Sequence, residues 1–162
     1  GISTGYHTEH NTDDTHKTIH ATGAIYEQGR TTAVGAWVEA APLASEFSAT
    51  APLTWIVTPA QVTTWEYTLI GNTLFVNFAV TGSTEGVSAW QPLTMEIPGG
   101  FTTSLTHQYF GTFEYQEGGT YGIGAVLVQA GQIRLYKAAR ANWLGSGSLD
   151  VHGQVFFEIG GD

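Results

Sequence analysis

The stretch TWEYTLIGNTLFVNFAV, residues 64–80, decides the fold class because apolar and polar side chains alternate along it with a period of two. Two such runs, 64–70 and 73–80, are separated only by Gly71 and Asn72. This pattern predicts an antiparallel hairpin with a tight turn, although Gly-Asn is less favoured there than Asn-Gly. The residues expected to face the core are Trp65, Tyr67, Leu69, Leu74, Val76, Phe78 and Val80.

Short runs of the same kind recur along residues 34–159, and clusters rich in glycine, such as Gly82-Ser83 and Gly145-Ser146-Gly147, separate them. A spacing of about ten residues favours an all-β sandwich or barrel. The sequence shows no convincing amphipathic helix of three turns. The expected strands are 34–40, 53–57, 64–70, 73–80, 93–97, 109–115, 122–129, 132–137 and 149–159.

Residues 1–32 differ from the rest because they are polar, carry few large apolar side chains and show no sustained period. Alone they could not bury enough apolar surface to offset the entropy of ordering. We therefore expect two parts, an extended and irregular N-terminal leader over 1–32 and a β-sandwich domain over 33–162.

Composition limits the classes of partner. The 162 residues are 42% hydrophobic, which suffices for one domain, and 14 Asp+Glu against five Lys+Arg give a net charge of −9. Nucleic acid and anionic membrane surfaces are disfavoured because both require clustered basic residues. The sequence has no apolar run of about 18 residues, so we expect no membrane insertion. Cysteine is absent, which excludes disulfides and Cys-ligated zinc.

Four of the six histidines lie close together in the leader, at His7, His10, His16 and His20. Imidazole is a common metal ligand, and His16 and His20 share one face of an extended strand because they are four residues apart. The threonines around them disfavour a helix. We expect a hydrogen-bonded polar stalk that requires no cofactor. The alternative is a structural metal ion bound by these histidines, which several chains could share at an axis.

Enzyme signatures are weak. Jelly-roll glycosidases place two carboxylates across a cleft, and Glu66, Glu96 and Glu114 fall on expected strands, but Glu66 alternates onto the solvent side. The chain has no Gly-x-Ser-x-Gly elbow and no phosphate-binding Gly-x-x-x-x-Gly-Lys loop. We therefore expect no enzymatic activity, with a glycosidase-like enzyme as a remote alternative.

Aromatic residues make up 12% of the chain, and exposed rings beside hydrogen-bonding groups can bind sugars. The expected glycan-binding residues are Trp90, Tyr109, Tyr121, Tyr136, Asn142 and Trp143. The alternative is that most of these rings serve the core, plug loops or contact other subunits. Phe75 and Phe156 alternate onto the outer side of their strands, which makes them candidates for an oligomer interface.

Three segments resemble the C-terminal jelly-roll domain of tailed-phage tail fibres and minor virion structural proteins. They are HATGAIYEQGRTTAVGAWVEA at 20–40, TWEYTLIGNTLFVNFAVTGSTEGVSAWQPLTMEIPGGFTT at 64–103, and NWLGSGSLDVHGQVFFEIG at 142–160. The resemblance implies an antiparallel jelly-roll-like β-sandwich on the virion surface, assembled as a homotrimer at a fibre or spike.

Together these features predict a non-enzymatic phage virion protein that attaches to a host-surface glycan, with its leader bound to other virion proteins. The alternative role is that of a decoration protein that binds the capsid or tail rather than sugar.

Overall fold

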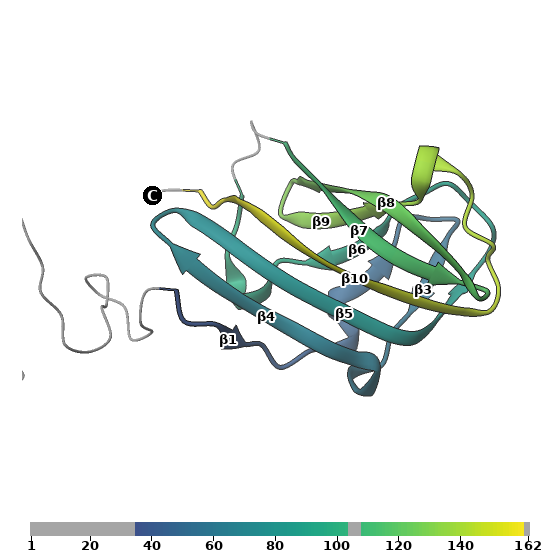
Figure 1. The fold of residues 1–162 in the computed structure, drawn as a ribbon, viewed down its shortest axis with the longest axis horizontal. Coiled ribbons are helices and arrows are strands. Elements are labelled where there is room, and N and C mark those ends of the chain that lie inside the picture. The colour runs from purple at the N-terminus through teal and green to yellow at the C-terminus, as the bar shows by residue number, and fades with distance from the viewer. Residues whose placement is uncertain (1–34, 104–107, 161–162) are drawn as a thin grey trace, which may run out of the picture. The chain divides into compact units, whose positions relative to one another are not determined.

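A computed structural model of the protein describes residues 35–103 and 108–160 (Figure 1). The expected leader, with its boundary at residue 32 and its four candidate metal-binding histidines, lies outside the described residues. Those expectations therefore stay predictions. The described residues all belong to the expected sandwich domain.

The described residues form strands joined by turns and by short 3₁₀ segments of three residues each. The strands are β1 (Val38–Glu39), β2 (Phe47–Ala49), β3 (Thr54–Ile56), β4 (Val62–Ile70), β5 (Thr73–Gly86), β6 (Leu93–Glu96), β7 (Tyr109–Glu117), β8 (Thr120–Gln129), β9 (Gln132–Tyr136) and β10 (Ser148–Glu158). The 3₁₀ segments are η1 (Ala44–Glu46), η2 (Pro59–Gln61), η3 (Pro98–Gly100) and η4 (Ala138–Arg140). Nowhere in these ranges is a helix long and apolar enough to span a membrane.

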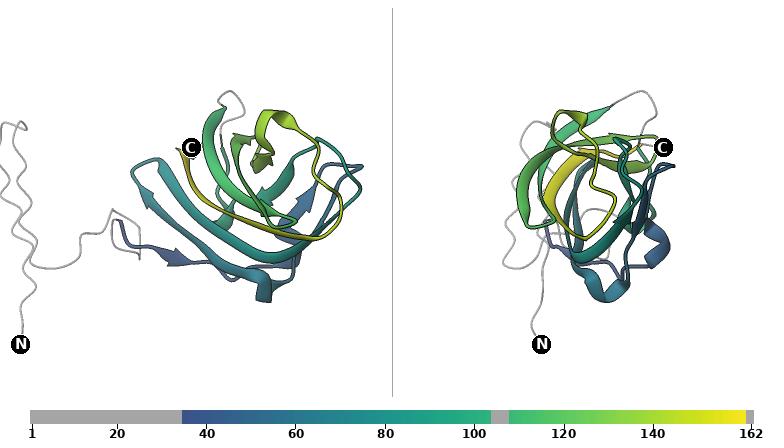
Figure 2. Two further views of the ribbon diagram at one scale, coloured as in Figure 1. Left: turned by 45° about the vertical axis from the view of Figure 1, so that its right-hand side comes forward. Right: turned by 90° about the vertical axis from the view of Figure 1, so that its right-hand side faces the viewer.

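The strands form one antiparallel sheet in the order β1-β4-β5-β10-β7-β8-β9-β6-β2. The remaining strand, β3, pairs with the end of β5 and is not part of this linear order. The sheet curls strongly, and its inner face encloses the core (Figure 2). The prediction of an all-β, antiparallel, jelly-roll-like sandwich is confirmed. β10 lies between β5 and β7 in the middle of the sheet, so it joins the two halves of the hydrogen-bonded order.

The hairpin predicted from residues 64–80 is confirmed, with Ile70 paired to Thr73. The positive φ of its turn falls on Gly71 (59°) and not on Asn72, as in a type II′ turn, which explains why Gly precedes Asn here. Alternation sets the faces of both strands. The side chains of Trp65 and Leu74 are buried in the core.

One local prediction is wrong, and one strand was not predicted. Gly82-Ser83, expected to be a turn, lies inside β5, because Gly82 (φ 70°) faces a register shift in β10 and the strand then continues to Gly86. The Ser83 hydroxyl is buried and donates to the Leu149 carbonyl (2.6 Å), which ties this extension to β10. The edge strand β2 was not predicted, since its three residues are too few to show a period.

Candidate ligand-binding site

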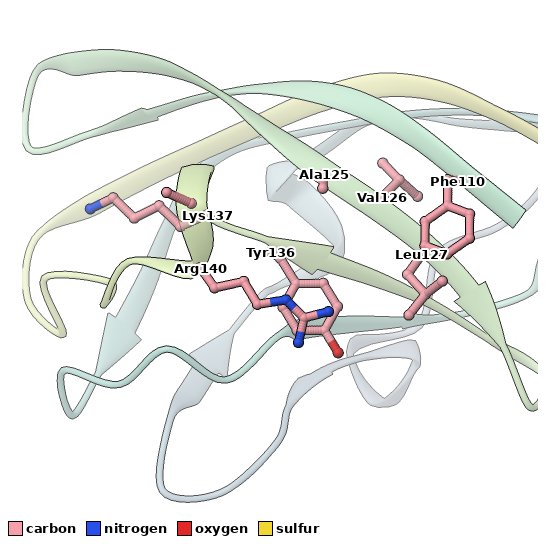
Figure 3. A pocket seen from close by; sticks show the side chains of 8 residues that line it. Phe110, Ala125, Val126, Leu127, Tyr136, Lys137 and Arg140 are labelled. Carbon is pink, nitrogen blue, oxygen red and sulfur yellow. The ribbon is translucent and has the colours of Figure 1, made fainter. Parts of the chain in front are cut away.

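The outer face of β8 and β9 carries a hollow of about 240 Å³, adjoining η4 (Figure 3). An outward-facing leucine, an alanine and a phenylalanine supply apolar surface, and a tyrosine and two basic residues come from β9 and the segment after it. The residues around the hollow are Phe110, Ala125, Val126, Leu127, Tyr136, Lys137, Ala139 and Arg140.

Tight hairpins hold this part of the sheet in register. Gly118-Gly119 joins β7 to β8 and Ala130-Gly131 joins β8 to β9, and all four residues have positive φ, as type I′ turns require. The register places Leu127 opposite Phe110 on one side, and Ala125 opposite Tyr136 on the other. Residues paired directly across strands have Cβ atoms about 5 Å apart. The floor of the hollow is therefore fixed by the backbone.

The side of the hollow is formed by Tyr136 with Arg140 across its ring (Figure 3), at 4.6 Å from the guanidinium carbon to the ring centroid. Tyr136 is only 8% exposed, whereas Arg140 is exposed. A cation over an aromatic face is held by the ring quadrupole, an interaction of about 0.5–2 kcal/mol. The arrangement presents an aromatic edge and a positively charged group to the same space.

The turn that carries Arg140 is strained. Ala139 (φ 54°) and Arg140 (φ 53°) are consecutive non-glycine residues in the left-handed region, and the Ala141 amide donates to the Ala138 carbonyl (3.0 Å) across them. Each such residue costs about 1–2 kcal/mol, and such strain clusters at functional sites. The position of Arg140 over Tyr136 thus depends on a backbone that its residue types do not favour.

Replacing Ala139 by Gly is expected to raise the free energy of unfolding by up to about 1 kcal/mol, because glycine adopts positive φ without a Cβ penalty. The gain is limited by the larger entropy of glycine in the unfolded chain. Urea unfolding of the two proteins measures it. Ala138→Gly is the matched control and should destabilise the protein, since Ala138 has no positive φ. Equal losses from both substitutions would contradict the assignment of strain to Ala139.

An ion pair anchors the start of this turn. Lys137 points away from the other labelled side chains in Figure 3, and its ammonium group contacts the carboxylate of Glu117. The same nitrogen lies 5.9 Å from the ring centroids of Tyr115 and Trp143. Since Glu117 is buried at the end of β7, the pair fixes the chain where β9 passes into η4.

Glu117 belongs to a buried carboxyl pair with Glu85 of β5. Burial, the hydrogen bond to Glu117 and the charge of Glu117 raise the pKa of Glu85 to about 8. Burial alone would raise the pKa of Glu117 too, but hydrogen bonds with Glu85, Lys137 and the Leu144 amide (2.6 Å) lower it. The Gly145 amide donates to Glu85 (3.2 Å). The amides of Leu144 and Gly145 thus tie the loop before β10 to the two carboxyl groups.

Two features of the sequence conceal this pair. The expected strand 109–115 stops short of Glu117, although alternation places Glu117 on the same face as Phe113 and Tyr115. Glu85 follows the irregularity at Gly82, which shifts the alternation of β5 by one residue. Continuing the period past Tyr115 would have identified Glu117, whereas nothing local indicates that Glu85 faces inward.

The prediction that Trp143 stacks on a sugar is wrong for the arrangement observed. Its side chain is 0% exposed, its ring packs edge-on against Tyr115 with centroids 5.4 Å apart, and its Nε1 donates to the Gln91 carbonyl (3.0 Å). A ring with no accessible surface cannot receive a ligand. Trp143 is a core residue despite its place in an irregular segment.

The other five expected glycan-binding residues do not form one cluster around the hollow. Tyr136 lines it, Tyr121 is exposed at the start of β8, and Trp90 is 46% exposed in the connection before β6. Asn142 is exposed after η4. Tyr109 is half-buried on β7, packs against Phe157, and donates its hydroxyl hydrogen to Glu158 (3.4 Å).

The three carboxylates considered for glycoside hydrolysis lie on β4, β6 and β7, which are not neighbours in the sheet. Each contacts a neighbouring side chain instead: Glu66 accepts from Asn77 (2.8 Å), Glu96 from Gln132 (3.2 Å), and Glu114 contacts His152 (3.0 Å). Within residues 35–103 and 108–160 no group of three or more His, Cys, Asp and Glu residues could hold a metal ion.

Comparisons with protein-family models, with curated proteins and with solved structures found no match to this chain.

Proposed function

We propose that the protein is a non-enzymatic phage virion protein whose sandwich domain attaches to a glycan on the host surface through the hollow beside η4. The observation that carries the proposal is the pairing of an aromatic ring with a cation, Tyr136 with Arg140, beside an apolar floor. Sugars present apolar C–H faces and polar edges, and this arrangement offers a partner for each. The sequence resemblance to phage fibre domains supports the same role.

The size and position of the hollow suit a small rigid ligand. At about 240 Å³ it is smaller than the ~300–1,000 Å³ of pockets for drug-sized molecules, so one or two rings of a longer glycan would enter it. Its floor is built from paired strands, and little ordering is needed on binding. Binding sites on strands are positioned more accurately than sites on loops.

The proposal includes assembly of several copies, as a homotrimer with the leader joined to other virion proteins. The rings of Phe75 and Phe156 lie 5.7 Å apart on the outer face, and Phe156 is 62% exposed. Exposed aromatic side chains grouped on one face are characteristic of protein contacts. Light scattering on the full chain distinguishes a trimer from a monomer.

Tyr136→Ala is expected to weaken binding to host surface polysaccharide by about tenfold or more, because it removes the ring and the support of Arg140. Binding is measured on immobilised polysaccharide, with a glycan array to identify the sugar. Tyr121→Ala is the matched control, since it removes an exposed ring from β8 outside the hollow. A larger loss from Tyr121→Ala than from Tyr136→Ala would place the site elsewhere.

Because Tyr136 is nearly buried, a second variant guards against loss of folding. Ala125 is exposed and pairs directly with Tyr136, so Ala125→Phe should fill the hollow without removing any contact. It should abolish binding while leaving the unfolding transition near that of the wild type. If the chain binds intact virus particles but no polysaccharide, the proposal fails and the decoration role takes its place.

A further inference from the structure

Positive charge is concentrated beside the hollow. Among the described residues the only Lys and Arg side chains are Arg134, Lys137 and Arg140, on β9 and the segment that follows it. The chain as a whole has a net charge of −9. A negatively charged ligand is therefore repelled by most of the molecule, and these residues are the place in the described domain where it would meet cations.

Two of these three cations lack an anionic partner in the described part of the chain. Lys137 is paired with the carboxylate of Glu117, whereas Arg140 contacts the ring of Tyr136 and forms no ion pair within the described residues. Arg134 has a buried Nε atom with no hydrogen-bond partner there. Like Arg140, Arg134 forms no ion pair within the described residues, so its charge is not neutralised there.

Arg134 lies next to the hollow. It precedes Tyr136 by two residues on β9, so the two side chains share the outer face, and it pairs with Leu127, which lines the hollow. On its other side it pairs with Thr94 of β6. Neither Leu127 nor Thr94 can neutralise a guanidinium. Within the described domain, Arg134 and Arg140 thus flank Tyr136 with their charges unpaired.

We infer that the hollow binds an anionic sugar, whose carboxylate or phosphate group is held by Arg134 and Arg140 while its ring lies on the apolar floor beside Tyr136. Guanidinium groups bind both kinds of anion through paired, charge-assisted hydrogen bonds. The inference rests on the proposed function and adds the charge of the ligand to it. A neutral sugar would leave both guanidinium groups without acceptors.

The test uses three probes with the same ring: glucose, glucuronate and glucose 6-phosphate, which differ in the group at the sixth carbon. Each is titrated into the full chain at constant ionic strength, and the backbone amide signals of residues 136–140 are followed by NMR. We expect glucuronate, glucose 6-phosphate or both to shift these signals at concentrations about tenfold lower than glucose. The probe that shifts the signals identifies the anionic group of the ligand as a carboxylate or a phosphate.

Arg134→Ala and Arg140→Ala should each weaken the response to the anionic probe by about tenfold, as expected for a lost charge-assisted hydrogen bond. Ala60→Glu is the matched control, since Ala60 is exposed in η2 and the substitution changes the net charge equally. Its response should remain close to that of the wild type.

Several outcomes overturn the inference. Equal responses to glucose and the anionic probes would keep a sugar site but remove the preference for charge. An equal loss in Ala60→Glu and Arg140→Ala would assign the effect to overall charge. If polysaccharide binding depends on Tyr136 but no anionic probe shifts the signals of residues 136–140, the inference fails and the proposed function stands. If neither the polysaccharide nor any probe binds, the proposed function fails as well.

Discussion

Glu85→Gln is expected to abolish most of the fall in stability that the wild-type protein shows between about pH 4.5 and pH 8. The folded protein keeps a proton on Glu85 up to a pKa of about 8, whereas the unfolded chain releases it near the ordinary value of 4.5. Between these values the folded state binds more protons than the unfolded state. The free energy of unfolding therefore falls as pH rises, by up to about 1.4 kcal/mol per pH unit.

Glutamine can preserve the contacts of the protonated acid. Its amide group can donate to Glu117, as the carboxyl proton does, and its oxygen can accept from the Gly145 amide. It carries no charge at any pH. The variant should consequently be more stable than the wild type at pH 8, where Glu85 would otherwise ionise beside the Glu117 carboxylate.

The measurement is denaturant unfolding at several values of pH from 5 to 8. Glu117 does not interfere in this window, because its lowered pKa makes its contribution fully present above 4.5 and lost only as pH falls further. Glu96→Gln is the control: this exposed side chain should leave the wild-type slope unchanged. A wild-type slope retained in Glu85→Gln would show that another group is responsible.

Trp143→Ala is expected to cost about 3–5 kcal/mol of unfolding free energy, the range for removing a fully buried large aromatic side chain. The substitution leaves a cavity beside Tyr115 and leaves the Gln91 carbonyl without its side-chain donor. It also removes a ring beneath the Lys137 ammonium group. This would be a large part of the stability of a domain of this size.

Two control variants separate the effect of the lost ring from that of the lost hydrogen bond. Trp143→Phe keeps an aromatic ring but loses the Nε1 donor, so its loss should be closer to the ~1–3 kcal/mol of one unsatisfied buried group. Trp90→Ala removes a half-exposed ring and should cost clearly less than Trp143→Ala. Denaturant unfolding of the three variants ranks them. Similar losses for Trp90→Ala and Trp143→Ala would contradict the core role of Trp143.

The sequence predicts the fold well where structure is local. Alternation over 64–80, with only two residues between the runs, is sufficient to place the hairpin, its register and its buried face. It fails at Gly82, because a shift in strand register depends on the partner strand, which local alternation does not reveal. The burial of Trp143 is missed for the same reason, since its hydrogen-bond partner Gln91 is 52 residues away in sequence.

The candidate site is only partly predictable. Alternation places Tyr136 on the outer face of β9, where it lies, and exposed aromatic residues are reasonable ligand contacts. The return of Arg140 over that ring requires positive φ at Ala139 and Arg140. Sequence reasoning assigns positive φ to glycine or asparagine, so no residue type here indicates the turn.

The central position of β10 makes the domain suitable for reconstitution from two pieces. Without this strand the sheet would divide into two parts, β1-β4-β5 and β7-β8-β9-β6-β2. A fragment lacking β10 would therefore have unpaired edges at β5 and β7, between which β10 normally lies. The peptide bond between Ser146 and Gly147 lies in the exposed bend just before β10. A break there would leave β10 held without this covalent link, by its hydrogen-bonded ladders and by the side chains that it buries in the core. A peptide spanning Ser148–Glu158 would be the complement that closes the sheet.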